Sequence, residues 1–490
     1  MTSIQNSDYS ITASIESDES KTLLDKPTES KSTCSSSVKG SSWFASVFMV
    51  VNAALGAGLL NFPDSYKQAG GVMIAIAIQA QCESQHKELL RLMKVVSDTT
   101  NLSFCIRTIF LVFVISALLI LAYCSDIKGT TTYQDVVLSV CGRNAQRLCA
   151  FTVIVYCFGT CITFLIIIGD QWEEFFLFVS KDLYCNDSPW YMNRITTICV
   201  SSVILILPLC FPKRIDFLKY PSMLGVVAIL YVVFLVTLKY FLSHPPPGPI
   251  KTKPDHPIDV FLVVPTICFA YQCHVSVVPI YSCMEKRNIR EFSKTVACAM
   301  SICIVTYTGT AAFGYFTFGE FVTSDILLAY SPDPEVLVAV IFIAMKTYTT
   351  YPILLFCGRA ALVSLWVDFR KMTINEIEAS ERRRRITSTI IWFILTLLLA
   401  VFIPNIGVVI KILGAFAAVF IFIFPGMCMM SAIQERVEVG IWTRKLKVLA
   451  VFACLFLILG TFIFGLTFTQ SIMSDQAGVK ADKSKYTCPS

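Results

Sequence analysis

Charged side chains are scarce in this sequence of 490 residues, where Asp, Glu, Lys and Arg together make up 15%. An ordinary soluble domain has roughly 25% charged residues. Hydrophobic residues make up 55% of the chain, and a water-soluble protein would have nowhere to bury that much apolar surface. The formal net charge of +6 is modest, so we expect no nucleic-acid partner.

Several motifs of catalysis and metal binding are also missing. The sequence has no GxxxxGK[ST] loop for ATP, no HExxH or GxSxG motif, and only 4 His, so we expect neither an ATP-driven pump nor an enzyme. It has 20 Cys but no CxxC pair, and many of these Cys lie inside apolar runs, where Cys behaves as a small hydrophobe. We therefore expect no disulfide framework, zinc site or other cofactor. The polar N-terminus has no apolar core, so no cleaved signal peptide is expected.

Long apolar runs dominate what is present. Runs of about 17 to 25 residues are long enough to cross a bilayer as helices, because only helices satisfy their own backbone groups in lipid. The sequence predicts an all-α integral membrane protein with about eleven spans: Trp43–Phe62, Gly71–Cys124 (interrupted), Leu148–Gly169, Ile195–Phe211, Tyr220–Phe241, Val260–Ile280, Thr295–Phe318, Val336–Phe356, Ile386–Ile403, Ile406–Phe424 and Val448–Phe468.

The loops between these runs alternate in charge. One set is rich in Lys and Arg, as in the run Arg382–Arg385, and the opposite set is nearly bare of cations. Cytosolic loops have the Lys/Arg excess, so the N-terminus is predicted to be cytosolic and the C-terminus non-cytosolic. Asn186-Asp187-Ser188 then lies on the non-cytosolic side as a glycosylation acceptor, although Pro189 follows it directly.

The predicted transporter domain covers residues 43–472, between a disordered cytosolic tail at 1–42 and a non-cytosolic tail at 473–490. In the first tail, Glu19, Leu23 and Leu24 have the spacing of an acidic dileucine sorting signal. The alternative is a chance match in a polar segment.

Residues 82–108 interrupt the second span. They include Glu83, Lys87, Glu88 and Arg91, and each charge would cost about 2.5–3.5 kcal/mol at the centre of a membrane helix. We interpret this segment as an insertion in the second span. The alternative is a genuine non-cytosolic loop, with residues 109–124 crossing alone.

The first span contains residues that weaken a helix. Gly56 and Gly58 each cost about 1 kcal/mol relative to Ala and expose backbone groups to a ligand, and Asn52 precedes them. The alternative is a small-residue face for helix packing.

The sixth span has a comparable interruption, because Pro265 and Pro279 bracket a segment with the polar residues Gln272 and His274. The alternative is a Pro-kinked helix with hydrogen-bonded polar side chains. However, spans one and six cross in opposite directions and stand five apart. Interrupted helices at matching places of two inverted halves indicate a transporter site, where freed N–H groups bind a substrate carboxylate and freed carbonyls bind a coupling cation.

The eighth span contains Thr347, Thr349 and Thr350, whose hydroxyls suit a hard cation such as Na⁺. The alternative is that they bond back to their own helix. Lys346 is unexpected at this depth, and we hypothesise that its ammonium lies near the cation site and weakens sodium dependence. Asp170, at the outer end of the third span, is interpreted as an interfacial carboxylate rather than a proton relay.

Eight short strings have a further likeness in common, and they lie at 52–63, 120–125, 158–161, 168–171, 265–269, 272–276, 351–354 and 356–359. They resemble the sodium-coupled neutral amino acid transporters of solute carrier family 38, in the amino acid/auxin permease group. The similarity covers nearly all of residues 42–468 and is greatest to the member-7 subgroup of lysosomal glutamine and asparagine transporters.

The resemblance implies a LeuT-like fold, with two inverted repeats of five helices and one extra helix. It implies sorting to lysosomes, with the plasma membrane as the alternative. The substrate would lie against the unwound parts of spans one and six, at Asn52, Ala53, Gly56, Gly58, Phe269, Tyr271, Gln272 and His274. A sodium ion would be bound by Asn52, the Leu55 carbonyl, Thr349 and Thr350. Two features depart from the family: residues 82–108, and Lys346 where a small residue is expected.

These observations predict a secondary transporter that moves neutral L-amino acids, glutamine and asparagine among them, by alternating access. The coupling ion would be sodium or a proton. The substrate carboxylate would meet freed amides near Gly56 and Gly58, and Gln272 or His274 would bond a side-chain amide. A channel would need a polar stripe along several helices, whereas the polar groups here cluster at one depth. A membrane amino acid sensor that signals through its N-terminal tail remains the alternative.

Overall fold

The structure is a computed structural model of the whole chain. It describes residues 41–68, 112–186, 189–212, 219–242, 250, 261–331, 333–403, 405–438, 440 and 442–476. The predicted sorting signal at Glu19, Leu23 and Leu24 and the insertion at 82–108 lie outside the described residues. The C-terminal tail was predicted to begin at residue 473, but the last described helix continues to Gln476.

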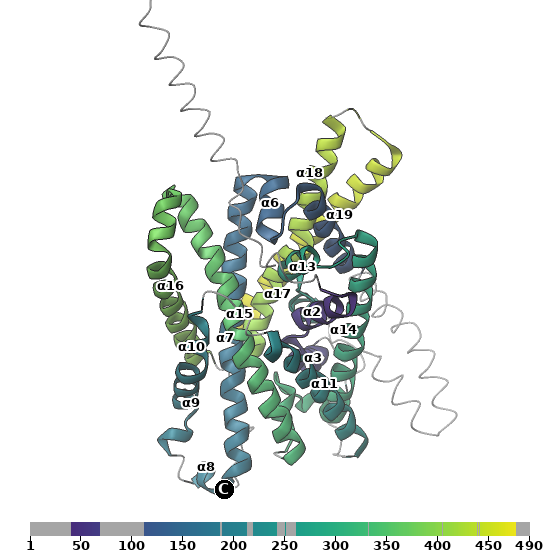
Figure 1. Ribbon diagram of the computed structural model, residues 1–490. Helices are drawn as coiled ribbons and strands as arrows, with labels where there is room; N and C mark the ends of the chain where they lie inside the picture. Colours follow the sequence, from purple (N-terminus) through teal and green to yellow (C-terminus); the bar gives the residue numbers. More distant parts are fainter. Residues whose placement is uncertain are drawn as a thin grey trace, which may run out of the picture.

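The described residues are almost entirely helical (Figure 1). The first half of the described chain forms α2 (Trp43–Ala54), α3 (Gly58–Gln68), a helix at Val112–Lys128, α6 (Tyr133–Cys141), α7 (Arg143–Val179), α8 (Lys181–Asn186), η1 (Trp190–Met192), α9 (Arg194–Ser201), η2 (Ser202–Ile206), α10 (Leu207–Cys210) and α11 (Lys219–Leu242). The second half forms α12 (Val264–Ala270), α13 (His274–Ser282), α14 (Ile289–Phe318), η5 (Gly319–Phe321), η6 (Ile326–Ala329), α15 (Pro334–Arg370), α16 (Ile374–Phe402), α17 (Ile406–Ala418), η7 (Val419–Ile423), α18 (Phe424–Glu438) and α19 (Arg444–Gln476).

The number of spans agrees with the sequence prediction. Among the described residues, 8 helices are long and apolar enough to cross a membrane, and the number reaches 10 if each of two bent helix pairs is one span. The shorter apolar helix Arg194–Cys210, which contains a π-helical turn at η2, accounts for one more. The predicted class, an all-helical membrane protein of about eleven spans, is confirmed.

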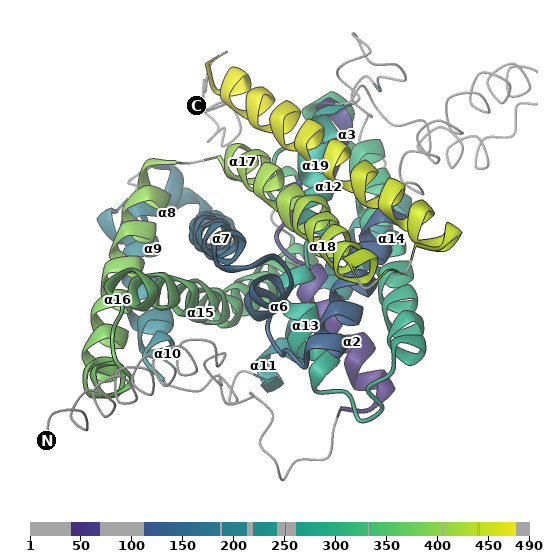
Figure 2. The ribbon, with the colours of Figure 1, turned by 90° about the horizontal axis from the view of Figure 1, so that it is seen from above.

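Two long helices, α7 and α15, pack along one another. Each has 37 residues, and Figure 2 shows α7 beside α15, with α16 and α6 near the two ends of α15. α17 connects this pair to α12, because Gly414 lies directly against the α12 backbone: a Cβ at Gly414 would be 2.1 Å from the Pro265 carbonyl oxygen. The broken segment described below is therefore held close to a rigid pair.

Cation-rich segments gather at one end of the molecule. Figure 1 places the α15–α16 turn, the α18–α19 turn and α6 at the upper end and α8 at the opposite end. The run Arg382–Arg385 lies near the start of α16, and Arg444 begins α19. This arrangement agrees with the alternating loop charge, and the assignment of the cytosolic side remains a prediction.

Asp170 is buried within the protein. Only 5% of its surface is exposed, and its Oδ1 accepts a hydrogen bond from Arg194 Nη2 at 2.8 Å. A buried carboxylate needs a paired cation, and α9 supplies one. The placement of Asp170 at the membrane interface stays a prediction.

Candidate functional site

The first span is interrupted where its glycines lie. α2 ends at Ala54, and Leu55 leaves the helix with ψ 91°. The chain re-enters a helix at Gly58, and α3 is bent by 53° from α2. Asn52 and Ala53 lie in the last turn of α2. Because the helix ends at Ala54, the carbonyls of Ala54 and Leu55 lie outside its regular hydrogen-bond pattern.

The sixth span is interrupted in a similar way. α12 ends at Ala270, and α13 begins at His274. Between them Tyr271 has φ −87° and ψ 6°, and Cys273 precedes α13 without a side-chain capping bond. Both predicted interruptions are therefore present, at Gly56 and at Tyr271.

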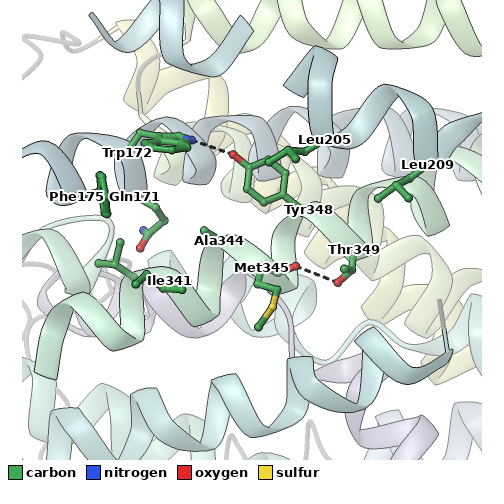
Figure 3. A pocket seen from close by; sticks show the side chains of 11 residues that line it. Gln171, Trp172, Phe175, Leu205, Leu209, Ile341, Ala344, Met345, Tyr348 and Thr349 are labelled. Carbon is green, nitrogen blue, oxygen red and sulfur yellow. Dashed lines mark hydrogen bonds between the residues drawn. The ribbon is translucent and has the colours of Figure 1, made fainter. Parts of the chain in front are cut away.

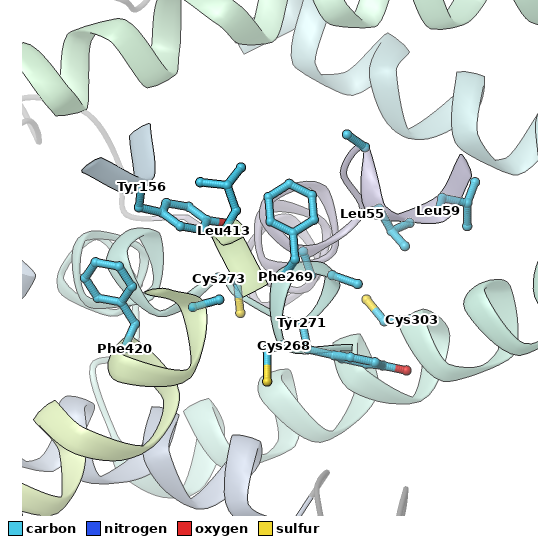
Figure 4. Packing of buried hydrophobic residues seen from close by; sticks show 14 of the residues in the cluster. Leu55, Leu59, Tyr156, Cys268, Phe269, Tyr271, Cys273, Cys303, Leu413 and Phe420 are labelled. Carbon is cyan, nitrogen blue, oxygen red and sulfur yellow. The ribbon is translucent and has the colours of Figure 1, made fainter. Parts of the chain in front are cut away.

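The two breaks face one another. A Cβ added to Gly58 would lie 3.0 Å from Ala270 Cβ and 3.4 Å from Phe269 Cδ1, so only glycine fits this approach without displacing α12. Tyr307 on α14 connects both breaks: its hydroxyl lies 2.7 Å from the Ala54 carbonyl and 3.0 Å from the Ala270 carbonyl. One hydroxyl proton is thus shared between the ends of α2 and α12. Figure 4 shows Leu55 and Leu59 of the first span beside Phe269 and Tyr271 of the sixth.

Aromatic rings surround the breaks. The Tyr271 ring contacts the Tyr307 ring edge-on, with centroids 5.2 Å apart. The Phe269 ring lies 6.1 Å from Tyr156 of α7, which itself contacts Phe420 of η7 at 5.7 Å. An apolar wall therefore separates the breaks from α7 and η7.

Buried polar side chains lie at the second break, and one of them has an unused hydrogen-bonding atom. Gln272 is 7% exposed, and its Nε2 has no partner among the described residues. His274 at the start of α13 is fully buried. At the first break, a Cβ at Gly56 would meet only the Ala54 carbonyl, at 3.8 Å, so open space lies beside it. An unused donor at one break and open space beside the other are features that a polar ligand could use.

The four predicted sodium ligands are all among the described residues, and the sodium site that they would form stays a prediction. The Leu55 carbonyl accepts a hydrogen bond from the Lys346 ammonium of α15. The hydroxyls of Thr349 and Thr350 donate to the Lys346 carbonyl, at 2.9 and 2.7 Å, which leaves their oxygen lone pairs available to a ligand. Asn52 lies close to the Lys346 side chain, because a Cβ built on Gly225 of α11 would be 3.7 Å from Asn52 Oδ1 and 3.1 Å from Lys346 Cγ.

Thr349 also borders a separate cavity of about 410 Å³ between α7, α10 and α15 (Figure 3). Its lining is mostly apolar, with Leu205 and Leu209 on one side. Trp172 Nε1 donates to the Tyr348 hydroxyl at 2.9 Å across one wall. No residue of either break lines this cavity, so it is distinct from the site at the breaks.

A carboxylate cluster lies beside the second half of α7. Asp325, at the start of η6, is fully buried; its Oδ1 accepts from the Leu327 N–H at 2.9 Å, and its Oδ2 accepts from Gln171 at 3.3 Å. Burial, together with the neighbouring negative charge of Asp170, raises the pKa of Asp325 to about 7, while the Leu327 N–H opposes the shift.

Sequence reasoning missed Tyr307 and Asp325. Tyr307 lies inside a long apolar run, and only its hydroxyl at membrane depth could have marked it. Asp325 lies in a loop, where a carboxylate is expected to be exposed.

Comparison with known proteins identifies the family. Residues 101–473 match the model of the family described as "Transmembrane amino acid transporter protein". Human sodium-coupled neutral amino acid transporter 7 is 42% identical over 440 residues, covering 89% of this chain and 88% of that protein. Human solute carrier family 38 member 8 is 33% identical over 434 residues, covering 86% and 91%. The structure of MhsT in complex with L-phenylalanine has a TM-score of 0.47 at 13% identity, covering 88% of this chain and 97% of that chain. These relatives are transporters and not enzymes, and the chain belongs to the transmembrane amino acid transporter family.

Proposed function

We propose that this chain moves neutral L-amino acids across a membrane by alternating access, and that glutamine and asparagine are among its substrates. The observation that supports this function best is the pair of facing breaks held by Tyr307. A solute at this point would contact backbone groups from both helices, so a change in their relative position would change its access to either side.

The amino acid backbone fits the ends of the broken helices. The substrate carboxylate would lie at the N-terminus of α3, near Gly56 and Gly58, where unpaired amides and the helix dipole favour a negative charge. The open space beside Gly56 supports this placement, and Asn52 and Ala53 line the preceding turn. The α-ammonium group is the natural complement of the C-terminal end of α12, near Ala270.

Side-chain selection would come from the second break. The unpartnered Nε2 of Gln272 is a suitable donor to the amide oxygen of glutamine or asparagine. His274 is an additional candidate, and Phe269 and Tyr271 would contact the aliphatic part of the substrate. A site with a buried, unpaired donor favours substrates that satisfy it.

A coupling cation is expected at the other side of the first break. Two relatives are named as sodium-coupled. The resemblance implies that the coupling ion, sodium or a proton, would be bound by Asn52, the Leu55 carbonyl, Thr349 and Thr350. In this chain the Lys346 ammonium lies on the Leu55 carbonyl. A positive charge there would stabilise the C-terminal end of α2. It would shift the equilibrium between access states only by its differential affinity for them.

The chain's membrane would be that of the lysosome, with the plasma membrane as the alternative. The support is the dileucine pattern at Glu19, Leu23 and Leu24 and the resemblance stated above. The cationic loops would face the cytosol, together with the N-terminus.

Flux of labelled glutamine into proteoliposomes tests the function. We expect saturable uptake by the full chain, and a greater flux from a variant that lacks residues 82–108. Gln272→Leu should raise KM for glutamine by about tenfold and change KM for alanine much less, because alanine has no side-chain amide. Glutamine binding without net flux, in either form of the chain, would contradict transport and support the sensor.

A further inference from the structure

Lys346 is a buried cation with no carboxylate partner in the described part of the chain. Only 6% of its surface is exposed, and no described Asp or Glu lies within ion-pair distance. Lys239 on α11 is buried to a similar degree but is paired: it is 8% exposed, and its ammonium lies 2.8 Å from Asp333 and 2.7 Å from Glu335. A buried charge needs compensation, so what stabilises Lys346 must be something other than a carboxylate.

The compensation comes from the end of α2. The Lys346 ammonium donates a hydrogen bond to the Leu55 carbonyl, which the break has released from the helix. The C-terminal end of a helix also presents the negative end of its dipole. A freed carbonyl at the end of a half-helix is the group that binds a coupling sodium ion in transporters with broken helices, so Lys346 uses the interaction that such an ion would use.

The fit of the Lys346 side chain is specific. Its stem passes over Gly225 of α11, where an added Cβ would lie 3.1 Å from Cγ and 3.5 Å from Cδ of Lys346. The same position lies 3.7 Å from Asn52 Oδ1, so Asn52 and the Lys346 stem border one space. The side chain thus reaches from α15 to the break without displacing α11.

The position of the Lys346 ammonium conflicts with a sodium ion on the same carbonyl. The Thr349 and Thr350 hydroxyls donate into their own helix, and Thr349 borders the lateral cavity between α7, α10 and α15. A sodium ion on the Leu55 carbonyl would be within about 4 Å of the ammonium, where two like charges repel strongly even at an effective dielectric constant of about 20.

We propose that the Lys346 ammonium is a tethered cation that replaces the coupling sodium ion, so that amino acid transport by this chain does not require sodium. The inference rests on the proposed transport function. Lys346 would act as a positioning residue that holds the end of α2 against α15.

Proteoliposome flux of labelled glutamine, with sodium or with N-methyl-glucamine as the only added cation, tests the inference. For the full chain we expect the two rates to agree within about twofold. Lys346→Ser should transport at least about tenfold faster with sodium than without it, because the vacated carbonyl becomes free to bind the ion. Lys239→Ala is the control: it removes a buried Lys of another helix and should leave the ratio near that of the full chain. A purely structural role for Lys346 would lower both rates of the Ser variant without making its transport depend on sodium.

Two results would overturn the inference. One is a full chain whose glutamine flux is tenfold or more faster with sodium than without it. The other is an active Lys346→Ser variant whose flux is the same with and without sodium. If the variant does not fold, binding of radioactive sodium to the purified full chain decides the matter. Saturable sodium binding that other cations do not displace would contradict a tethered ammonium. If the full chain shows no glutamine flux with either cation, the proposed function fails, and the same sodium-binding measurement still decides the role of Lys346.

Discussion

Tyr307 connects two spans that are distant in sequence through one hydroxyl group. The carbonyls of Ala54 and Ala270 would otherwise lack a donor inside the membrane, where an unsatisfied backbone group is costly. The ring fills the space between Phe62, at 4.8 Å between centroids, and Tyr271, at 5.2 Å. At this residue, hydrogen bonding and packing stabilise the same arrangement.

Replacement of Tyr307 by Phe separates the two contributions. Tyr307→Phe keeps the ring and removes the hydroxyl, so we expect glutamine flux to fall by roughly fivefold to tenfold, from a loss of about 1 kcal/mol at the two carbonyls. The control is Tyr348→Phe, which breaks the bond to Trp172 beside the lateral cavity and should leave flux nearly unchanged. Equal losses in the two variants would show that the bridge has no special role.

Asp325 makes the stability of the chain depend on pH. Its pKa is raised from 3.8 to about 7, so folding favours its protonated form. Below about pH 4 this contribution is fully present, and it is lost as the pH rises through about 7. The free energy of unfolding should therefore fall, by at most about 4 kcal/mol, between pH 4 and pH 8.

Thermal unfolding of the purified chain at pH 5 and pH 8 measures this effect. We expect a higher midpoint at pH 5, and a clearly smaller difference for Asp325→Asn, whose amide cannot ionise. The nearby carboxylate of Asp170, paired with Arg194, remains in both proteins as a common background. A full chain that is more stable at pH 8, or an Asn variant with an undiminished difference, would contradict the assignment.

At the scale of elements, the breaks are short segments between well-formed half-helices. Leu55 N still bonds to Val51 O at 2.7 Å, and Ser276 N bonds to Cys273 O at 3.0 Å, so regular structure resumes within a few residues on each side. α12 is fixed further by α3: Ser65 Oγ lies 2.6 Å from Thr266 Oγ1. The two interrupted spans therefore form one hydrogen-bonded unit beside the α7–α15 pair.

The two glycines of the first break should respond differently to a methyl group. Gly58→Ala forces its Cβ against Ala270, so we expect a lower unfolding temperature and less flux. Gly56→Ala places its Cβ in open space where the substrate would lie, so we expect an unchanged unfolding temperature and a KM for glutamine raised several-fold. Thermal unfolding and flux kinetics of both variants check this. If Gly56→Ala is the less stable variant, or binds glutamine normally, the placement of the substrate is wrong.

At the scale of the whole molecule, charge and helix order define two ends. The cationic turns lie at one end and α8 at the other, with Asn186 as the last residue of α8. The predicted orientation places α8 outside the cytosol.

Glycosylation reports this orientation directly. In cells, we expect the full chain to lose apparent mass on treatment with a glycosidase that removes N-linked glycans, and Asn186→Gln to show no such loss. Lys181→Gln, a substitution in the same helix outside the acceptor triplet, should keep the glycan. If the glycosidase does not change the apparent mass of the full chain, the predicted non-cytosolic position of α8 is not supported.

Much of the architecture follows from local sequence. Apolar runs of bilayer length predict the helices, and Gly56 and Gly58 predict the first break, because a bilayer constrains length and backbone hydrogen bonding without reference to partners. The second break was predicted from Pro265 and Pro279 and the polar residues between them. Its matching position in the opposite half of the chain, five spans after the first break, supported that prediction.

What the tertiary structure decided is which groups meet. The shared hydroxyl of Tyr307, the Lys346 ammonium on the Leu55 carbonyl and the burial of Asp325 each join residues that are far apart in the chain. Sequence determined where helices form and fail, since those depend on neighbours along the chain. Only packing determined which group donates a hydrogen bond to each freed carbonyl, since that depends on which side chain of another helix lies beside it.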